Sequence, residues 1–132
     1  MRIRIVRKKM PSGSSVDSEI EWFCSTLGLC EHMRDDESAT RIFRCLLERG
    51  RYGRGLRSDD ISERVGKSRG AVVNQLNKLM AAGLVARRGT RYELREDTLL
   101  NTLVEMRRDL ERVFEDMEDI ARKIDEDLKR RP

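Results

Sequence analysis

The apolar positions between residues 58 and 83 recur at helical spacing, and they predict two helices joined by a tight turn. The shorter first helix has Ile61 and Val65 on its inward side, and Gly66 with Lys67 supplies the turn. A helix pair joined by a short turn that contains glycine is the helix-turn-helix arrangement. We therefore place a helix-turn-helix in the middle of the chain.

The second helix of this pair has clear start and stop signals. Ser68 suits the N-cap, because its hydroxyl can accept a hydrogen bond from an unpaired first-turn N–H group. Gly83 suits the end, because glycine adopts the left-handed conformation at little cost. The inward apolar positions are Val72, Leu76 and Leu79. Most of the remaining positions are polar or small, which predicts an exposed polar face.

A short β-hairpin is expected directly after this helix. Residues 84–88 and 91–94 suit two strands, and Gly89 with Thr90 suits the tip. Arginines stand beside the tip. A hairpin that follows a helix-turn-helix forms a wing, so the predicted fold class is mainly α with a small β-hairpin wing, a winged helix-turn-helix.

These blocks resemble the winged helix-turn-helix of ArsR/MarR-type transcriptional regulators. The resemblance is carried by residues 61–66 (ISERVG), 68–72 (SRGAV), 76–79 (LNKL) and 82–85 (AGLV). It covers about a third of the chain well. It implies a regulator that binds double-stranded DNA, although a fold does not determine function and some winged helices bind only proteins.

A long helix is predicted from residue 96 to about residue 129, without internal glycine or proline. Its apolar positions alternate at spacings of 4 and 3, which is the seven-residue repeat of a coiled coil. They are Leu99, Leu103, Met106, Leu110, Val113, Met117, Ile120 and Ile124, with Phe114 beside them. An exposed stripe of this size exceeds the apolar patches of soluble monomers. We therefore expect a C-terminal dimerisation helix, at residues 96–132, and a homodimer.

Two further helices are expected before the helix-turn-helix. The first runs from residue 16 to residue 27, with Ser18 and Glu21 as a capping box. Its Trp22 is expected in the core or in the dimer interface. The second runs from residue 37 to residue 49 and resembles the first helix of the winged-helix core. Residues 16–95 are thus taken as the DNA-binding domain.

The amino-terminal segment is basic. Residues 1–9 suit either a short edge strand or a flexible arm, and the segment up to residue 15 reads as an arm and linker. It lacks the apolar stretch and cleavage site of a secretory signal, and no run in the chain is long and apolar enough for a membrane span. We expect a cytoplasmic protein with no membrane partner.

Positive charge is concentrated on the predicted helix-turn-helix and wing. The 132-residue chain has a formal net charge of +4, but residues 51–95 hold 11 Lys/Arg against 4 Asp/Glu. Residues 96–132 hold 8 against 12 and are acidic. A basic surface also serves solubility, but its coincidence with the motif favours a polyanion such as DNA.

The candidate DNA contacts come from three segments. Arg69 and Asn74 are the expected base readers, since arginine suits guanine and asparagine suits adenine, and Lys78 is expected at phosphate. Wing arginines are expected on the backbone or in the minor groove. The loop at residues 51–57 offers either phosphate contacts or solvated charges. The full set is Ser68, Arg69, Gly70, Val73, Asn74, Asn77, Lys78, Arg87, Arg88, Arg91, Arg54 and Arg57.

The chain shows little that suits catalysis or a metal. Its only Cys and His residues are Cys24, Cys30, His32 and Cys45, and no CxxC is present. These four are a weak candidate metal or redox site beside the ordinary role of cysteine as a small buried residue. No phosphate-binding glycine motif, HExxH or nucleophile elbow is found, so we expect neither an enzyme nor a cofactor.

Two functions remain in competition. The first is a homodimeric DNA-binding transcriptional regulator, a repressor that blocks promoter access, with recognition helices about 34 Å apart on a pseudo-palindromic site. The second is a winged-helix and coiled-coil adaptor that binds proteins without specific DNA binding. Neither the operator nor an effector ligand is identified by the sequence, and it leaves parallel and antiparallel pairing of the C-terminal helices equally open.

Overall fold

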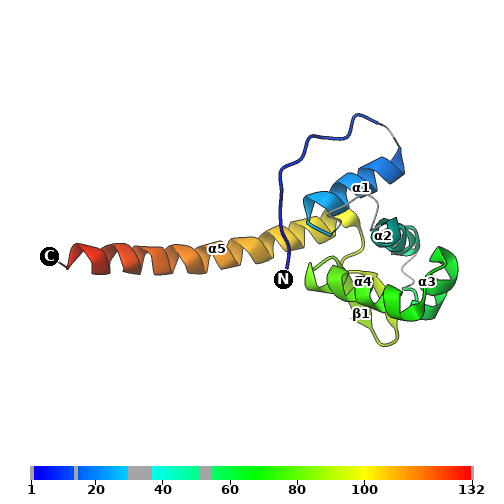
Figure 1. Ribbon diagram of the computed structural model, residues 1–132. Helices are drawn as coiled ribbons and strands as arrows, with labels where there is room; N and C mark the ends of the chain where they lie inside the picture. The colour runs from blue at the N-terminus through cyan, green and yellow to red at the C-terminus, as the bar shows by residue number, and fades with distance from the viewer. Residues whose placement is uncertain (1, 14, 30–36, 51–54, 132) are drawn as a thin grey trace.

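The computed structural model describes residues 2–13, 15–29, 37–50 and 55–131. In this part of the chain, residues 15–29, 37–50 and 55–95 form a helical head. A single long helix follows and projects from the head as a rod (Figure 1). The elements are α1 (Val16–Thr26), α2 (Glu37–Gly50), α3 (Ser58–Val65), α4 (Arg69–Ala81), β1 (Val85–Arg88), β2 (Arg91–Leu94) and α5 (Leu99–Lys129). This is the predicted winged helix-turn-helix with a long C-terminal helix.

Helix α2 is the centre of the head. It packs against α1, α3, α4 and β2. Ile42 and Phe43 of α2 are fully buried, together with Ile61 of α3 and Leu76 of α4. The Phe43 ring also lies 6.0 Å from the ring of Phe23 in α1, measured between centroids. Burial of these aliphatic and aromatic side chains holds α3 and α4 in place.

The hairpin joins the head through its second strand. β1 and β2 pair antiparallel, with Val85 opposite Leu94 and Arg88 opposite Arg91. Leu56 adds an isolated bridge to Tyr92, in which each backbone N–H donates to the other residue's carbonyl at 2.8 and 2.7 Å. This bridge joins the residue just before the α3 entrance to the wing.

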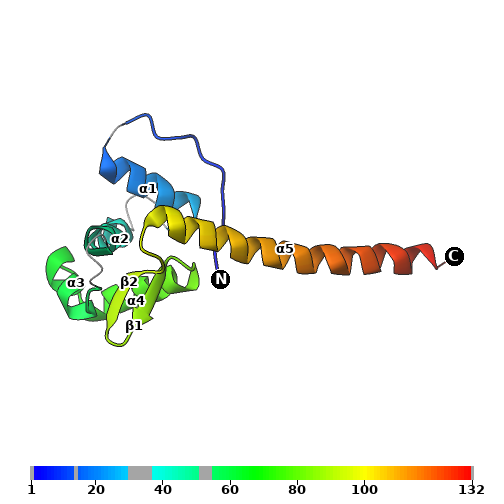
Figure 2. The same cartoon turned by 180° about the vertical axis from the view of Figure 1, so that it is seen from behind.

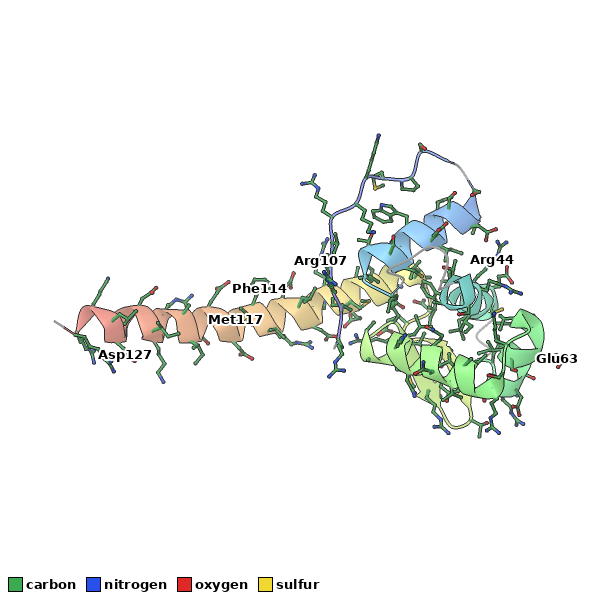
Figure 3. The ribbon with its side chains drawn as sticks, viewed as in Figure 1. Arg44, Glu63, Arg107, Phe114, Met117 and Asp127 are labelled. Carbon is green, nitrogen blue, oxygen red and sulfur yellow. The ribbon has the colours of Figure 1, made fainter. Side chains whose placement is uncertain are left out.

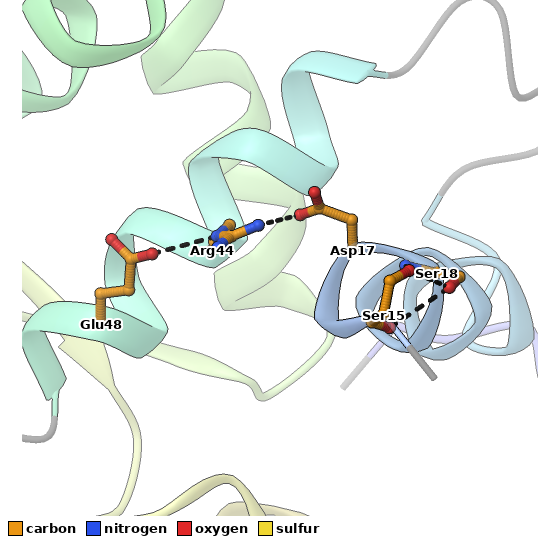
Figure 4. Close-up of polar contacts among 5 residues, drawn as sticks. All are labelled: Ser15, Asp17, Ser18, Arg44 and Glu48. Atoms are coloured by element: carbon orange, nitrogen blue, oxygen red, sulfur yellow. Dashed lines mark hydrogen bonds and ion pairs between the residues drawn. The ribbon is translucent and has the colours of Figure 1, made fainter. Parts of the chain in front are cut away.

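An arginine in α2 fixes α1 to the head. The Arg44 guanidinium donates to the Asp17 carboxylate of α1 and, at 3.0 Å, to Glu48 one turn along α2 (Figure 4). The N-cap of α1 is Ser15, whose hydroxyl accepts from the Ser18 N–H at 3.1 Å. The prediction of Ser18 as the capping residue was therefore wrong, because the helix begins one turn earlier than that box requires.

The basic amino-terminal segment is an extended arm along α1. The N–H groups of Arg4 and Val6 donate to the carbonyls of Leu27 and Thr26 at 3.3 and 3.0 Å. Gly28 has a positive φ of 73°, and a Cβ there would lie 2.8 Å from Arg4. Glycine at this position therefore allows the arm to approach. Residues 2–9 contain no strand.

Helix α5 begins at Leu99, three residues later than predicted. Thr98 is its N-cap, and the Thr98 hydroxyl accepts from the Asn101 N–H at 3.0 Å. The Glu96 N–H instead donates to the Thr102 hydroxyl at 3.1 Å, which folds residue 96 back over the first turn. A threonine cap therefore sets the boundary, and the acidic residues before it belong to the connection.

Only the first two turns of α5 pack on the head. Thr102 is fully buried and Met106 is 2% exposed. Met106 thus belongs to the core of its own chain, and its placement among the dimerisation residues needs correction. The reason is the position of the head, which covers this part of the repeat. Leu99 and Leu110 are half-buried, and Leu103 is 38% exposed.

Beyond residue 110 the helix lies free of the head, as both views of the ribbon show (Figures 1 and 2). Its large apolar side chains are between 50 and 63% exposed: Val113, Phe114, Met117, Ile120, Ile124 and Leu128. Phe114 and Met117 stand on the rod well away from the head (Figure 3). None of the described helices combines the length and the apolar character needed to cross a membrane.

Candidate nucleic-acid interface

The turn between α3 and α4 is built by local hydrogen bonds. Gly66 ends α3 in the left-handed region with a φ of 70°, and its N–H donates to the Ser62 carbonyl. The Ser62 hydroxyl in turn donates to the Lys67 carbonyl. Ser68 then caps α4 by accepting from the Ala71 N–H at 3.2 Å. The predicted turn and cap are confirmed, and they set the direction of α4.

One side of α4 is buried and the other is open to solvent. Val72, Leu76 and Leu79 are buried as predicted. Gly70, Asn74 and Asn77 lie within about 40° of one line along the helix at ~100° per residue. Asn74, Asn77 and Lys78 are exposed, and nothing lies within 4 Å of the point that a Cβ on Gly70 would occupy. This exposed polar face can enter a groove without burying apolar side chains.

Arg69 lies apart from the centre of that face. At ~100° per residue it is about a quarter of a turn away from Gly70, on the side of α3. Its Nε lies 3.5 Å from Oδ1 of Asp59, and both side chains are more than 70% exposed. Arg69 is therefore held at the edge of the α4 face by a solvent-exposed ion pair, which water and salt weaken.

The wing begins beside the end of α4. Gly89 forms the tip with a φ of 64°. The Arg87 guanidinium lies over the Tyr92 ring, 5.7 Å from its centroid, and its Nε donates to the Gly89 carbonyl at 3.0 Å. Tyr92 belongs to the buried side of the hairpin. Arg87 therefore extends the packed face of the wing, in the strand that contacts α4.

Residues 43–87, from α2 to β1, match the family described as bacterial regulatory protein, arsR family. This segment is an ArsR-type winged helix-turn-helix. The match supports a role in DNA-binding transcription regulation, with double-stranded DNA as the partner that an ArsR-family helix-turn-helix implies. It ends before β2, so α1, the second wing strand and α5 lie outside it. No curated protein and no solved structure matches the chain.

The wing of this ArsR-type domain divides its arginines between two faces. Arg88 and Arg91 are paired across the ladder and point to the side opposite Tyr92. Arg88 Nε lies 2.5 Å from Glu93 Oε1, and Arg91 Nη1 donates to the Gly55 carbonyl at 3.0 Å. The three wing arginines therefore do not form one surface, and the charge of Arg88 is partly neutralised.

An open polar hollow lies between this outer face of the wing and α3. Its lining mixes four arginines with three carboxylates: Arg49, Arg64, Arg88, Arg91, Asp60, Glu63 and Glu93. Arg49 and Arg64 were not among the sequence-based candidates. They are distant in sequence from the wing, and only the packing of α2 and α3 beside β2 brings these charges together. The near balance of charge makes this face a weaker anion site than α4.

The loop before α3 is only partly described. Arg57 is exposed, and its backbone N–H donates to the Asp60 carboxylate at 3.2 Å, which fixes the entrance to α3. Arg54 lies outside the described residues. Both arginines remain predicted phosphate contacts of the ArsR-type domain.

The cysteines lie in the packed part of the head. Cys24 is fully buried and Cys45 is half-buried, and neither forms a disulfide with another described residue. Burial raises the pKa of the Cys45 thiol, which disfavours the reactive thiolate. Cys30 and His32 lie outside the described residues. Elsewhere in the described chain no three Cys, His, Asp or Glu side chains gather as a metal site would require.

Trp22 lines an open apolar depression of about 580 Å³ together with Phe23, Phe43 and Leu99. Leu99 is the first residue of α5, so the Trp22 helix and the start of the long helix meet here. The Trp22 indole N–H is buried without a hydrogen-bond partner among the described residues. The assignment of Trp22 to a dimer interface stays a prediction.

Proposed function

We propose that the protein is a homodimeric repressor that binds a pseudo-palindromic site in duplex DNA and blocks access to the promoter. In this proposal α4 enters the major groove, where Asn74 and Asn77 at the centre of the face and Arg69 at its edge read bases. Lys78 contacts phosphate, and Arg87 extends the contact from the wing. The observation that carries the proposal is the exposed polar face of α4 beside a basic wing within an ArsR-type domain.

The charge distribution supports this assignment. The segment that contains α3, α4 and the wing has the basic excess, while α5 is acidic. A duplex is therefore attracted to the head and repelled by the rod. Contacts to phosphates release counterions, so affinity depends steeply on salt.

If the protein were an adaptor that binds other proteins, the exposed face of α4 would carry different residues. A protein-docking helix presents apolar or aromatic anchors at its centre. None of the strongly exposed large apolar residues of the described chain belongs to α4. They lie on the arm, at the start of α1 and on α5, which favours DNA as the partner of the head and a protein as the partner of the rod.

Fluorescence anisotropy with labelled duplex DNA tests the proposal. The protein is titrated at several salt concentrations, first with random duplex and then with sites recovered by binding-site selection. We expect selection of inverted repeats and a log–log salt slope that corresponds to several phosphate contacts. Retention of no duplex at low salt, or enrichment of no sequence, overturns the proposal.

Matched variants separate base reading from phosphate contact. Asn74→Ala is expected to weaken binding to the selected site about tenfold or more and to relax the preference at one base pair. Lys78→Ala is expected to weaken all sequences alike and to reduce the salt slope by about one. Lys129→Ala, at the far end of α5, removes the same charge and serves as the control.

A further inference from the structure

The exposed stripe of α5 begins where the head ends. Met106 is buried in its own chain, and beyond residue 110 the strongly exposed apolar positions run from Val113 to Leu128. An apolar stripe of this length on a free rod requires cover by another chain. The residues of the stripe indicate the direction in which the covering helix runs.

The positions at the centre of the stripe disfavour a parallel pair. In the heptad, Leu110, Met117 and Ile124 occupy position a, and Val113 and Ile120 occupy position d. Parallel two-stranded coils prefer β-branched residues at a and leucine at d. Here both central d positions are β-branched, which is the reverse of that preference.

The two flanks of the stripe differ in character. Flank e carries Phe114, Ala121 and Leu128, and is apolar over its distal half. Flank g carries Asp116 and Lys123, which have opposite charge and make no ion pair with another described residue of their own chain. In a parallel pair each g residue faces an e residue of the other helix, which sets charges against apolar side chains. In an antiparallel pair e faces e and g faces g.

We propose that α5 forms an antiparallel two-stranded coiled coil with α5 of a second copy, centred between residues 118 and 119. This inference rests on the homodimer of the proposed function and specifies its arrangement. Asp116 of each chain then faces Lys123 of the other, twice per dimer. Phe114 faces Ala121 on the opposite flank, a large side chain against a small one. Met117 packs against Ile120 in the central layer.

Neighbouring registers are rejected by the same residues. If the pairing shifts by one heptad toward the head, Asp116 lies opposite Asp116 of the other chain. This register also requires Met106 in the seam, although Met106 is already buried by the head of its own chain. A shift of one heptad away places Lys123 opposite Lys123. Only the central register opposes Asp116 to Lys123 and avoids a pair of like charges at these positions, and it uses the exposed part of the rod alone.

The arrangement also sets the distance between the two heads. The last buried residue, Met106, is level with residue 131 of the other chain. At a rise of ~1.5 Å per residue, the two copies of Met106 lie about 38 Å apart along the rod. This spacing is close to the ~34–36 Å that separates half-sites one turn apart on DNA. An antiparallel rod can therefore hold one head at each end, at about the spacing of two successive half-sites.

Charge reversal tests the direction and the register together. Asp116→Lys creates two repulsive Lys–Lys pairs, and we expect the dissociation constant of the dimer to rise about tenfold by analytical ultracentrifugation at low salt. Adding Lys123→Asp to the same chain restores two attractive pairs and dimerisation. Glu115→Lys changes the charge equally on the outer side of the helix and is the control. A dimer that Asp116→Lys affects no more than Glu115→Lys overturns the proposal.

Distances between spin labels give an independent measurement. Single cysteines replace Arg122 or Lys129, both on the outer face, in a chain whose three native cysteines are alanine. The antiparallel pair predicts axial separations of about 10 Å for residue 122 and about 32 Å for residue 129 at ~1.5 Å per residue. Equal distances at the two sites, or a tetramer in solution, overturn it. A monomer that still binds duplex DNA with a steep salt slope overturns the pairing and leaves DNA binding by the head intact.

Discussion

Asp59 of α3 and Arg69 of α4 form an ion pair across the helix-turn-helix, with Oδ1 and Nε 3.5 Å apart. The two residues stand at the starts of the two helices, and the pair holds an arginine that we expect at the DNA. A phosphate or a guanine edge must compete with this carboxylate. We therefore expect the ion pair to weaken DNA binding, because the Asp59 carboxylate competes for Arg69, while it also positions the arginine.

Removal of this carboxylate is expected to strengthen binding. Asp59→Asn leaves Arg69 unpaired, and we expect the affinity for duplex DNA to rise about two- to fivefold at low salt, because exposed pairs are weak. Glu63→Gln changes the net charge equally but lies on the side of α3 that lines the polar hollow, and is the control. Anisotropy titrations measure both, and an equal gain for the two variants means that only net charge matters.

Arg69→Ala is expected to weaken binding to the selected site and to relax its sequence preference, because arginine pairs with guanine through two hydrogen bonds. A gel-shift series on matched and mismatched duplexes measures both effects. Arg69→Lys keeps the charge and loses the paired contact, so it should retain the non-specific affinity only. Full specificity in Arg69→Ala would remove this residue from the base readers.

Gly70 offers a variant in which stability and binding move in opposite directions. Its Cβ position is open, so Gly70→Ala should stabilise α4 by up to about 1 kcal/mol through helix propensity. The added methyl group stands on the face that approaches DNA, and we expect a loss of affinity of about threefold or more on the argument that glycine allows close backbone approach. Thermal unfolding and anisotropy on the same sample measure the two effects. A stabilised variant with unchanged affinity would place Gly70 outside the interface.

The connection between the wing and α5 should depend on pH. Arg95 Nη1 donates to Asp109 Oδ2 at 2.6 Å, and this hydrogen bond lowers the pKa of the Asp109 carboxyl. A lowered pKa in the folded state contributes stability above the ordinary carboxyl pKa, and this contribution is lost as the pH falls through the lowered value. Asp109→Asn is expected to lower the Tm by about 3 °C at pH 7.

The difference in Tm between Asp109→Asn and the natural protein should decrease as the pH is lowered into the acid range. Circular dichroism melts at pH 7 and at several acid values measure it. Glu111→Gln, on an exposed position of the same helix, should show no such convergence. A difference in Tm that does not change with pH would mean that Asp109 acts through packing rather than through its charge.

The N-cap of α4 gives a test of local stability. Ser68→Ala removes the acceptor for the Ala71 N–H and is expected to cost about 1 kcal/mol. Ser68→Thr keeps a hydroxyl and should recover most of the loss. Denaturant unfolding of the three proteins measures the differences. Equal stability of the alanine variant would mean that water replaces the cap without cost.

Many features of the head could be predicted because they depend on residues that are close together in the sequence. The Ser68 cap, the left-handed glycines at 66 and 83 and the buried positions of α4 all follow from spacing within one or two helical turns. The same holds for the seven-residue repeat of α5. Backbone hydrogen bonds and helix periodicity connect near neighbours, so these features need no knowledge of the rest of the fold.

Other features depended on contacts between segments far apart in the chain. The pairing of Arg69 with Asp59, the division of the wing arginines between two faces and the burial of Met106 are of this kind. The repeat of α5 treats Met106 and Met117 alike, since both occupy seam positions. Only the packing of the head on the first two turns separates them, because burial is set by what lies opposite a side chain in space and not by its spacing along the helix.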